Sequence, residues 1–278
     1  MSVASIPIPT MRMALLYNAL NAMDRPARGF EWVEAPWGPV LTCPALSPVA
    51  VHGWTTRALK LELPDEQCAS QWTALAVYAD LTFAELSRLT QVHGRDIVPI
   101  DRPGGVVARA DGQSTARPDV LLAIRVADCV PLLVADMRTG AVAAVHAGWR
   151  GTAAGIAHAA IAHMSAQYGT NPGDVVAAVG PSIGPCSYVV GEDVRAAFLE
   201  SGWGEAQVGS WFVERSDLRL DLWRANRDQL VQAGVPATAV YVAELCTACN
   251  EDAFYSYRRE GKGTGRMVGF IARRREGP

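Results

Sequence analysis

The middle third of the chain carries the pattern that most restricts its fold: short apolar runs followed by one amphipathic stretch. The apolar runs are residues 120–127, 131–135 and 141–145. Runs of this length, rich in Val, Leu and Ile and separated by the turn residues 136–140, predict buried strands. Residues 152–168 then place apolar side chains at helical spacing, with Thr152 as the expected N-cap and Gly169 as the expected stop.

Further strands and helices are expected later in the chain. The expected strands are residues 175–179, 239–243 and 267–272, and the expected helices are 192–201 and the second part of 218–234, with Gly234 as C-cap. Runs of strands with helices between some of them are typical of mixed sheets covered by helices, so the expected fold class is α+β. Because no repeat, low-complexity tract or Ser/Gly/Pro linker divides the chain, we expect one domain.

Composition and charge exclude several classes of protein. The 278 residues can bury a sizeable core, and 50% hydrophobic with 19% charged residues is ordinary globular composition. A net charge of −3 lacks the basic footprint of a nucleic-acid or anionic-membrane binder. No apolar run approaches the roughly 18 residues that span a bilayer. We therefore expect a cytoplasmic protein with neither a membrane nor a nucleic-acid partner.

The first residues and the cysteines support the same view. Residues 1–10 carry no positively charged side chain, unlike a leader, and 26–29 predict a turn. Residues 1–28 are therefore expected to form a loosely attached arm and 29–278 the folded domain. The six cysteines are Cys43, Cys68, Cys129, Cys186, Cys246 and Cys249. Their wide spacing is not that of a disulfide scaffold, so we expect reduced thiols.

Two histidines and one cysteine lie next to apolar runs, where strands are expected to end. His146 follows the run 141–145, His93 precedes a shorter one, and Cys129 lies between two strands. Two imidazoles and a thiolate suit zinc and leave a fourth position open, as in catalytic sites. The long spacing does not by itself bring the three together, and a buried cysteine is usually a small apolar residue.

The second cysteine pattern, Cys246-Thr247-Ala248-Cys249, is interpreted as two incidental thiols after a strand. It has no second CxxC and no thioredoxin-like surroundings, so a metal or redox role is the alternative. His158 and His163 lie about 140° apart around the expected helix and cannot share a ligand. We expect them, like His52, to be surface or packing residues.

Arginines are the other candidates for a binding role. Arg150 stands where a helix is expected to begin, and helix N-termini favour anions. Arg258 precedes the glycine-rich residues 261–266, which could close on an anion. The alternative for both is a solvated charge. The glycine-rich segment lacks the P-loop pattern, which argues against binding of a nucleoside triphosphate.

Seven motifs together resemble a known family. They are TQVHG (90–94), VADCVPLL (126–133), VHAGWRGT (145–152), VGPSIGPCSYVVG (179–191), LDLWRAN (220–226), CTACNEDAFYSYRR (246–259) and TGRM (264–267). In this order they resemble the YfiH-like family, described variously as polyphenol oxidases or laccase-domain proteins, purine nucleoside phosphorylases and peptidoglycan editing factors. The resemblance runs from about Trp32 to Ala272. It implies a single domain built as a four-layer α/β/β/α sandwich.

The resemblance also implies a site and an activity. By motif position, zinc would be held by His93, Cys129 and His146. The implied reactions are phosphorolysis of adenosine, inosine and guanosine, phosphorolysis of methylthioadenosine, and deamination of adenosine. Arg150 is the first candidate for binding phosphate. Arg57 and Arg258 follow it as further phosphate-binding candidates, and Asp128 is expected to orient a metal ligand.

One departure and two alternative functions remain. The family's glycine-rich loop is replaced after Arg57 by Ala58–Glu62, so specificity or rate is expected to differ. A multicopper oxidase needs many histidines in HxH pairs, and five histidines without such a pair cannot supply them. A single copper remains a weaker alternative to zinc. A cell-wall editing factor that acts through binding is the other, and the sequence predicts no oligomeric state.

Overall fold

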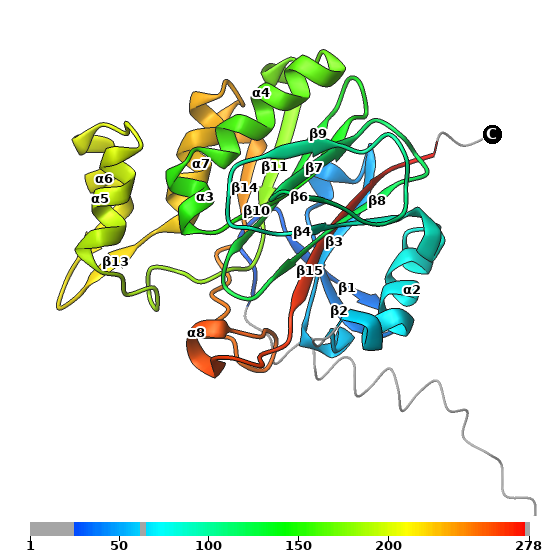
Figure 1. Cartoon of the computed structure of the whole chain (residues 1–278), viewed down its shortest axis with the longest axis horizontal. Helices are drawn as coiled ribbons and strands as arrows, with labels where there is room; N and C mark the ends of the chain where they lie inside the picture. The colour runs from blue at the N-terminus through cyan, green and yellow to red at the C-terminus, as the bar shows by residue number, and fades with distance from the viewer. Residues whose placement is uncertain (1–24, 62–64, 276–278) are drawn as a thin grey trace, which may run out of the picture.

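Two mixed β-sheets stacked face to face form the centre of the computed structural model, which describes residues 25–61 and 65–275 (Figure 1). The seven-stranded sheet has the order β1 (Glu31–Ala35), β2 (Gly38–Thr42), β3 (Ala50–Thr55), β15 (Met267–Arg273), β8 (Leu121–Val126), β4 (Leu86–Thr90), β6 (Gly105–Arg109). The six-stranded sheet has the order β14 (Val240–Val242), β11 (Val175–Val179), β9 (Val130–Asp136), β10 (Val142–Ala147), β7 (Gly112–Thr115), β5 (Ile97–Pro99). A separate antiparallel pair consists of β12 (Phe212–Glu214) and β13 (Leu218–Leu220).

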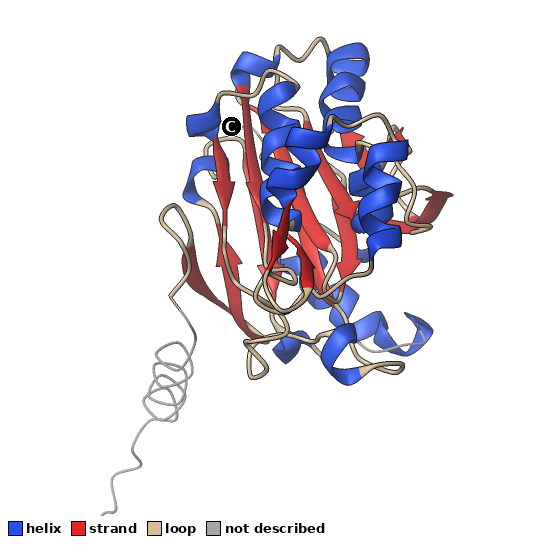
Figure 2. Cartoon of the chain, turned by 90° about the vertical axis from the view of Figure 1, so that its left-hand side faces the viewer, coloured by secondary structure: helices blue, strands red, loops and turns tan. Residues whose placement is uncertain are grey.

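Helices cover the outer faces of both sheets, as Figures 1 and 2 show. The seven-stranded sheet is covered by α2 (Ala69–Tyr78). On the six-stranded side lie α3 (Trp149–Ala153), α4 (Ile156–Tyr168), α5 (Glu192–Glu200), α6 (Glu205–Trp211) and α7 (Leu222–Gln232). The short α8 (Tyr257–Glu260) precedes β15. The 3-10 helices are η1 (Pro44–Leu46), η2 (Arg57–Leu59), η3 (Asp65–Cys68), η4 (Phe83–Glu85), η5 (Pro172–Asp174) and η6 (Ala237–Ala239).

The apolar runs form strands because both of their faces are buried. In β8, Leu122 and Ile124 belong to the core between the sheets, whereas Leu121 and Ala123 pack with Trp72 of α2. Successive side chains of a strand point to opposite faces, so a strand buried on both faces is apolar throughout. In β9, Leu133 and Ala135 enter the inter-sheet core, and Leu132 and Val134 pack in the helix-covered core. The layers are therefore α, β, β, α, which confirms the expected α+β sandwich.

The helix expected at 152–168 is in fact two helices. Gly155 has φ 81°, which ends α3 and lets α4 begin in a new direction. The expectation of Thr152 as N-cap is wrong, because Thr152 lies inside α3 and its hydroxyl accepts a hydrogen bond from the Asn226 amide (3.1 Å). The expected stop is confirmed, since Gly169 adopts φ 63° after α4. The C-cap of α7 is Ala233 rather than the expected Gly234, which is the next residue and adopts φ 97°.

The beginning of the described chain packs against the six-stranded sheet. The Ala27 N–H donates to the Ala243 carbonyl (3.2 Å), and the expected turn contains Gly29 at φ 96°. The greater part of the expected arm, residues 1–24, lies outside the described residues. Within the described ranges, no helix is both long and apolar enough to cross a membrane.

Two of the other histidines have packing roles, as expected. The Nε2 of His163 lies 2.8 Å from the Ser114 hydroxyl. His52 is buried, and its Nε2 accepts the Cys43 N–H (2.9 Å). Burial first, and the charge of Arg274 to a lesser extent, lower the pKa of His52 to about 4. This side chain is therefore neutral in the folded protein at pH values where it is protonated in the unfolded chain.

The depressed pKa of His52 predicts acid sensitivity. The unfolded chain binds the extra proton below a pH of about 6.5, so stability is complete above that value and falls towards pH 4. The loss from this one group is up to about 3 kcal/mol. His52→Gln keeps an acceptor for the Cys43 N–H but cannot titrate. In urea unfolding, wild type should lose more stability on acidification than this variant; equal losses would contradict the assignment.

Candidate metal centre and binding cavity

Three candidate ligands converge where the two sheets meet. His93 follows β4 of the seven-stranded sheet, His146 lies on β10 of the six-stranded sheet, and Cys129 lies in the turn that carries the chain from β8 to β9. One ligand atom from each lies within 4.8 Å of the others. The two imidazole rings stand nearly perpendicular, with centroids 4.8 Å apart. The structure thus brings together residues that are 36 and 17 positions apart in sequence, counted from 93 to 129 and from 129 to 146.

A buried carboxylate, Asp111, holds two of these ligands. Its Oδ1 accepts the His93 N–H (2.9 Å) and lies 2.8 Å from His146 Nδ1. Its Oδ2 accepts the N–H groups of Val92 (3.2 Å) and Gly94 (2.6 Å). The Asp111 carbonyl accepts the His146 N–H as well (2.7 Å). Four donors on one carboxylate fix both the loop that carries His93 and the ring of His146.

These bonds set the protonation of the site. Burial opposes ionisation of Asp111, but hydrogen bonds from His146 and Gly94 outweigh it and hold its pKa below the usual range. Because His146 Nδ1 donates to this carboxylate, Nε2 is the ring nitrogen left to bind a metal ion. Burial would raise the pKa of Cys129, yet His146 and His93 lower it. The cysteine is thereby favoured as a thiolate, the form that binds metals.

Two glycines leave the space that this arrangement needs. A Cβ at Gly148 would lie 3.1 Å from both Cys129 Sγ and His93 Cδ2. A Cβ at Gly151 would lie 2.7 Å from the Gly94 carbonyl. The motif Gly-Trp-Arg-Gly therefore packs α3 against the loop of His93 without a side chain in between. His93 itself has φ 61°, an uncommon conformation outside glycine that concentrates at functional sites.

A cavity of about 660 Å³ opens over the three ligands. Its positively charged lining consists of Arg125, Arg150, Arg258 and Arg266. Its aromatic lining consists of Trp149, Tyr188 and Tyr257. The Arg150 guanidinium lies 4.2 Å from the centroid of the Trp149 ring, and that of Arg258 lies 5.0 Å from the Tyr188 ring. Two of the four guanidinium groups thus lie against aromatic rings in the lining of the cavity.

The predicted arginines do not all reach this cavity. Arg150 and Arg258 line it, whereas Arg57 does not. Arg57 lies over the Tyr255 ring (4.7 Å) and 3.8 Å from the Glu260 carboxylate, and it donates to the Glu251 carbonyl.

Sequence reasoning missed three residues of the site. Arg125 interrupts an otherwise apolar strand, and that interruption was a usable signal. Arg266 belongs to the TGRM motif but was assigned no role. Burial first, and then the charge of Arg125, lower the pKa of Arg266, which marks two close cations. Asp111 carried no local signal, because its partners lie 17 to 35 residues away.

Asp128 has a different role from the one expected. Its Oδ1 accepts the Thr247 hydroxyl (2.6 Å), and its Oδ2 accepts the Arg258 N–H (2.7 Å). No bond to His93 or His146 is found for it, and Asp111 occupies the orienting position instead. Asp128 therefore anchors the start of α8 beside the cavity.

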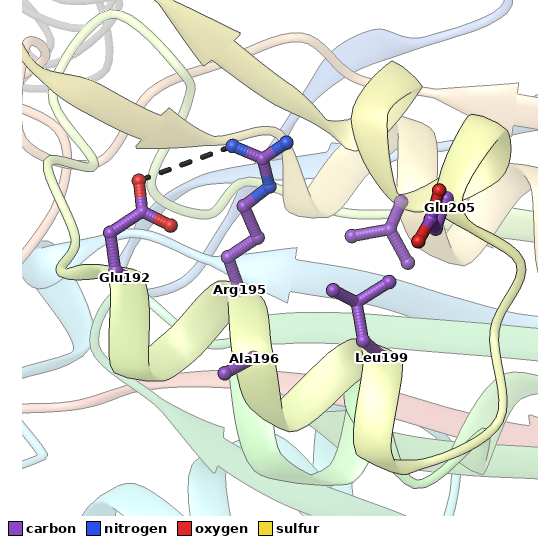
Figure 3. A pocket seen from close by; sticks show the side chains of 6 residues that line it. Glu192, Arg195, Ala196, Leu199 and Glu205 are labelled. Carbon is purple, nitrogen blue, oxygen red and sulfur yellow. Dashed lines mark ion pairs between the residues drawn. The ribbon is translucent and has the colours of Figure 1, made fainter.

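A second hollow lies between α5 and α6 (Figure 3). Arg195 lies 4.0 Å from the Glu192 carboxylate there and 2.7 Å from that of Glu214. Its lining residues are Glu192, Arg195, Ala196, Leu199, Glu205 and Val208. This set contains no thiol, imidazole or hydroxyl, and its one cation is already paired. We therefore place the candidate site in the cavity over Cys129.

A family model described as multi-copper polyphenol oxidoreductase laccase matches residues 57–274. The chain belongs to this family. A purine nucleoside phosphorylase of Deinococcus radiodurans is 40% identical over 260 residues, which are 88% of this chain and 97% of the relative. One of Bacteroides thetaiotaomicron is 43% identical over 161 residues, 58% of this chain and 60% of the relative. The crystal structure of YlmD from Geobacillus stearothermophilus matches with a TM-score of 0.78 at 34% identity, covering 91% of this chain and 99% of that one. The expected YfiH-like family is thereby confirmed.

The four bonds to Asp111 predict that its charge cannot be replaced. Each oxygen of Asp111 accepts from two donors, so in Asp111→Asn the amide nitrogen, itself a donor, would face two donors whichever position it took. We therefore expect the metal-free protein to lose about 3 kcal/mol of stability. Asp136→Asn is the matched control. Asp136 is equally buried, but its two backbone donors, Arg138 and Thr139, both bond Oδ1, and its other neighbours are the hydroxyls of Thr139 and Thr170, which can accept from an amide. Urea unfolding of both variants measures the difference; equal effects would contradict the role of Asp111.

Proposed function

We propose that this protein is a zinc-dependent purine nucleoside phosphorylase that also deaminates adenosine and cleaves methylthioadenosine. One observation carries the proposal: a His–Cys–His ligand set, oriented by a buried carboxylate, lies at the base of a cavity lined by arginines and aromatic rings. The names of the relatives, purine nucleoside phosphorylase, support this activity at the level of the family.

The donor set fits zinc. One thiolate and two imidazoles, with an open fourth position, are typical of catalytic zinc. A histidine that binds zinc usually donates its other ring N–H to a carboxylate, as His146 does to Asp111. His93, Cys129 and His146 would hold the ion. Zinc held there would supply Lewis acidity and the capacity to activate water, which deamination requires.

The arginines supply what phosphorolysis needs. A phosphate that attacks the ribose carbon must be held in place and have its charge balanced. Arg150 and Arg258 present guanidinium groups to the cavity. Arg125 and Arg266 repel each other there, and an anion between them would relieve that repulsion. Arg57 lies outside the lining, so we assign the phosphate to the other four.

The aromatic residues suit the base. A cavity of this size accommodates a nucleoside, and the rings of Trp149, Tyr188 and Tyr257 offer faces on which a purine can stack. Tyr188 remains a neutral phenol, because burial, and then the negative charge of Cys129, raise its pKa. It can therefore donate a hydrogen bond to the substrate.

The alternatives predict different chemistry. A copper oxidase would use a single copper at this site, since among the described residues only one cluster combines histidine with cysteine. An editing factor would bind its partner and leave nucleosides intact. Both are outcomes of the experiment below.

We expect the purified protein to convert inosine and phosphate to hypoxanthine and ribose-1-phosphate, and adenosine to adenine with phosphate and to inosine without it. Chromatography identifies the products. Cys129→Ala should lose one equivalent of zinc and lower turnover by more than about 100-fold, because it removes a ligand rather than a supporting residue. Cys68→Ala, which removes a buried thiol outside the site, should keep both zinc and activity.

Three results would contradict the proposal. Intact nucleosides at high enzyme concentration would favour the editing factor. Stoichiometric copper with phenol oxidation would favour the oxidase. Equal turnover by Cys129→Ala and Cys68→Ala would exclude the site. Deamination without phosphorolysis would show that the phosphate assignment is wrong and the metal assignment right.

A further inference from the structure

A second cluster of three thiols lies outside the candidate active site. Cys186 follows β11, and Cys246 and Cys249 follow β14. Strands β11 and β14 are parallel neighbours, so both loops leave the same end of the sheet, and a bridge joins Ser182 to Cys246. The three sulfur atoms lie within 4.8 Å of one another, and those of Cys186 and Cys249 are 3.4 Å apart. Chain topology therefore completes the CxxC pattern with a third cysteine that the sequence does not place beside it.

One backbone donor favours the thiolate form of Cys246, and a tight turn brings Cys249 beside it. The Gly184 N–H donates to Cys246 Sγ (3.3 Å). The N–H groups of Cys249 (3.3 Å) and Asn250 (3.0 Å) both donate to the Cys246 carbonyl, which folds the four-residue motif into a tight turn. The Ser187 hydroxyl lies 3.2 Å from Cys249 Sγ. Cys246 is buried while the other two thiols are exposed, so an ion can reach the cluster from solvent.

We propose that Cys186, Cys246 and Cys249 form a second metal site that binds a thiophilic d¹⁰ cation, Zn²⁺ or Cu⁺. Three thiolates are the donors that such ions prefer. Zinc–sulfur bonds of about 2.3 Å place tetrahedral thiolates roughly 3.8 Å apart. This value lies between the 3.4 Å that separates the sulfurs of Cys186 and Cys249 and the 4.8 Å within which all three sulfurs lie. Ser187 or solvent completes the coordination.

The ion would connect the two loops that support the cavity wall. Thr247, between the two cysteines of the motif, donates to Asp128, the neighbour of Cys129. The Arg259 guanidinium donates to the carbonyls of Thr247 (2.8 Å) and Ala248 (3.0 Å), which joins the motif to α8. Tyr188, two residues after Cys186, lines the cavity beneath Arg258. The second metal site would thus position the residues of the cavity lining. Its effect on nucleoside turnover rests on the proposed function, whereas the binding of a metal by the three cysteines does not.

The test separates the two sites by their thiols. Cys129→Ala is purified under reducing conditions as the full chain and titrated with Cd²⁺, then with Zn²⁺ and Cu⁺ in competition. We expect about one equivalent of Cd²⁺ with strong thiolate-to-cadmium absorption, displaced by one of the other two ions. Cys129→Ala/Cys249→Ser and Cys129→Ala/Cys186→Ser should lose that absorption. Cys129→Ala/Cys68→Ala, which keeps the cluster intact, should retain it.

Circular dichroism and melting temperature check that each variant folds. An absence of thiolate absorption in folded Cys129→Ala would overturn the proposal. So would equal absorption in the Cys249→Ser and Cys68→Ala backgrounds. A Cys186–Cys249 disulfide that persists under these reducing conditions and excludes metal, seen as the loss of two hydrogens by mass spectrometry, would replace it with a redox pair. These outcomes do not depend on nucleoside turnover, so failure here leaves the proposed function standing.

Discussion

The carboxylate of Asp111 is the interaction on which the site depends. It joins the two sheets at the site. It accepts three N–H groups from the loop after β4 and the Nδ1–H of His146 on β10. A buried, fully satisfied carboxylate is strong and directional because little water competes for its bonds. It therefore fixes, with a single group, the loop that carries His93 and the tautomer of His146, two of the candidate metal ligands.

The packed sheets hold the strained backbone of the candidate metal site in place. His93 and Asp128, the residue before Cys129, both adopt positive φ. Each such residue costs about 1–3 kcal/mol of backbone strain, which persists only where the surrounding structure imposes it. Here β8 and β9 enter different sheets on either side of Cys129, and their apolar faces fill the core between. The strained turn is thus the point where the chain changes layer, and the cost is offset by the burial of two strands.

Local pattern predicted the central strands β8 to β11 and the helices α4, α5 and α7, whereas it predicted none of β1 to β4 or α2. Strands such as β11 were predicted to the residue, because burial on both faces makes a strand apolar throughout. The break at Gly155 was missed, since one left-handed glycine does not interrupt the apolar spacing. The contacts of Asp111 and Cys186 were missed because their partners are distant in sequence, up to 63 residues for Cys186 and Cys249. The ligand triad itself came from the family resemblance, and the spacing alone left it open.

Zinc-edge X-ray absorption tests the central claim, that His93, Cys129 and His146 together form one metal site, most directly. Cys249→Ser loaded with one equivalent of zinc is the suitable sample, because it leaves His93, Cys129 and His146 as the remaining ligand set. We predict one sulfur at about 2.3 Å and two imidazole nitrogens at about 2.0–2.1 Å. A first shell with two or more sulfurs, or with none, would contradict the account.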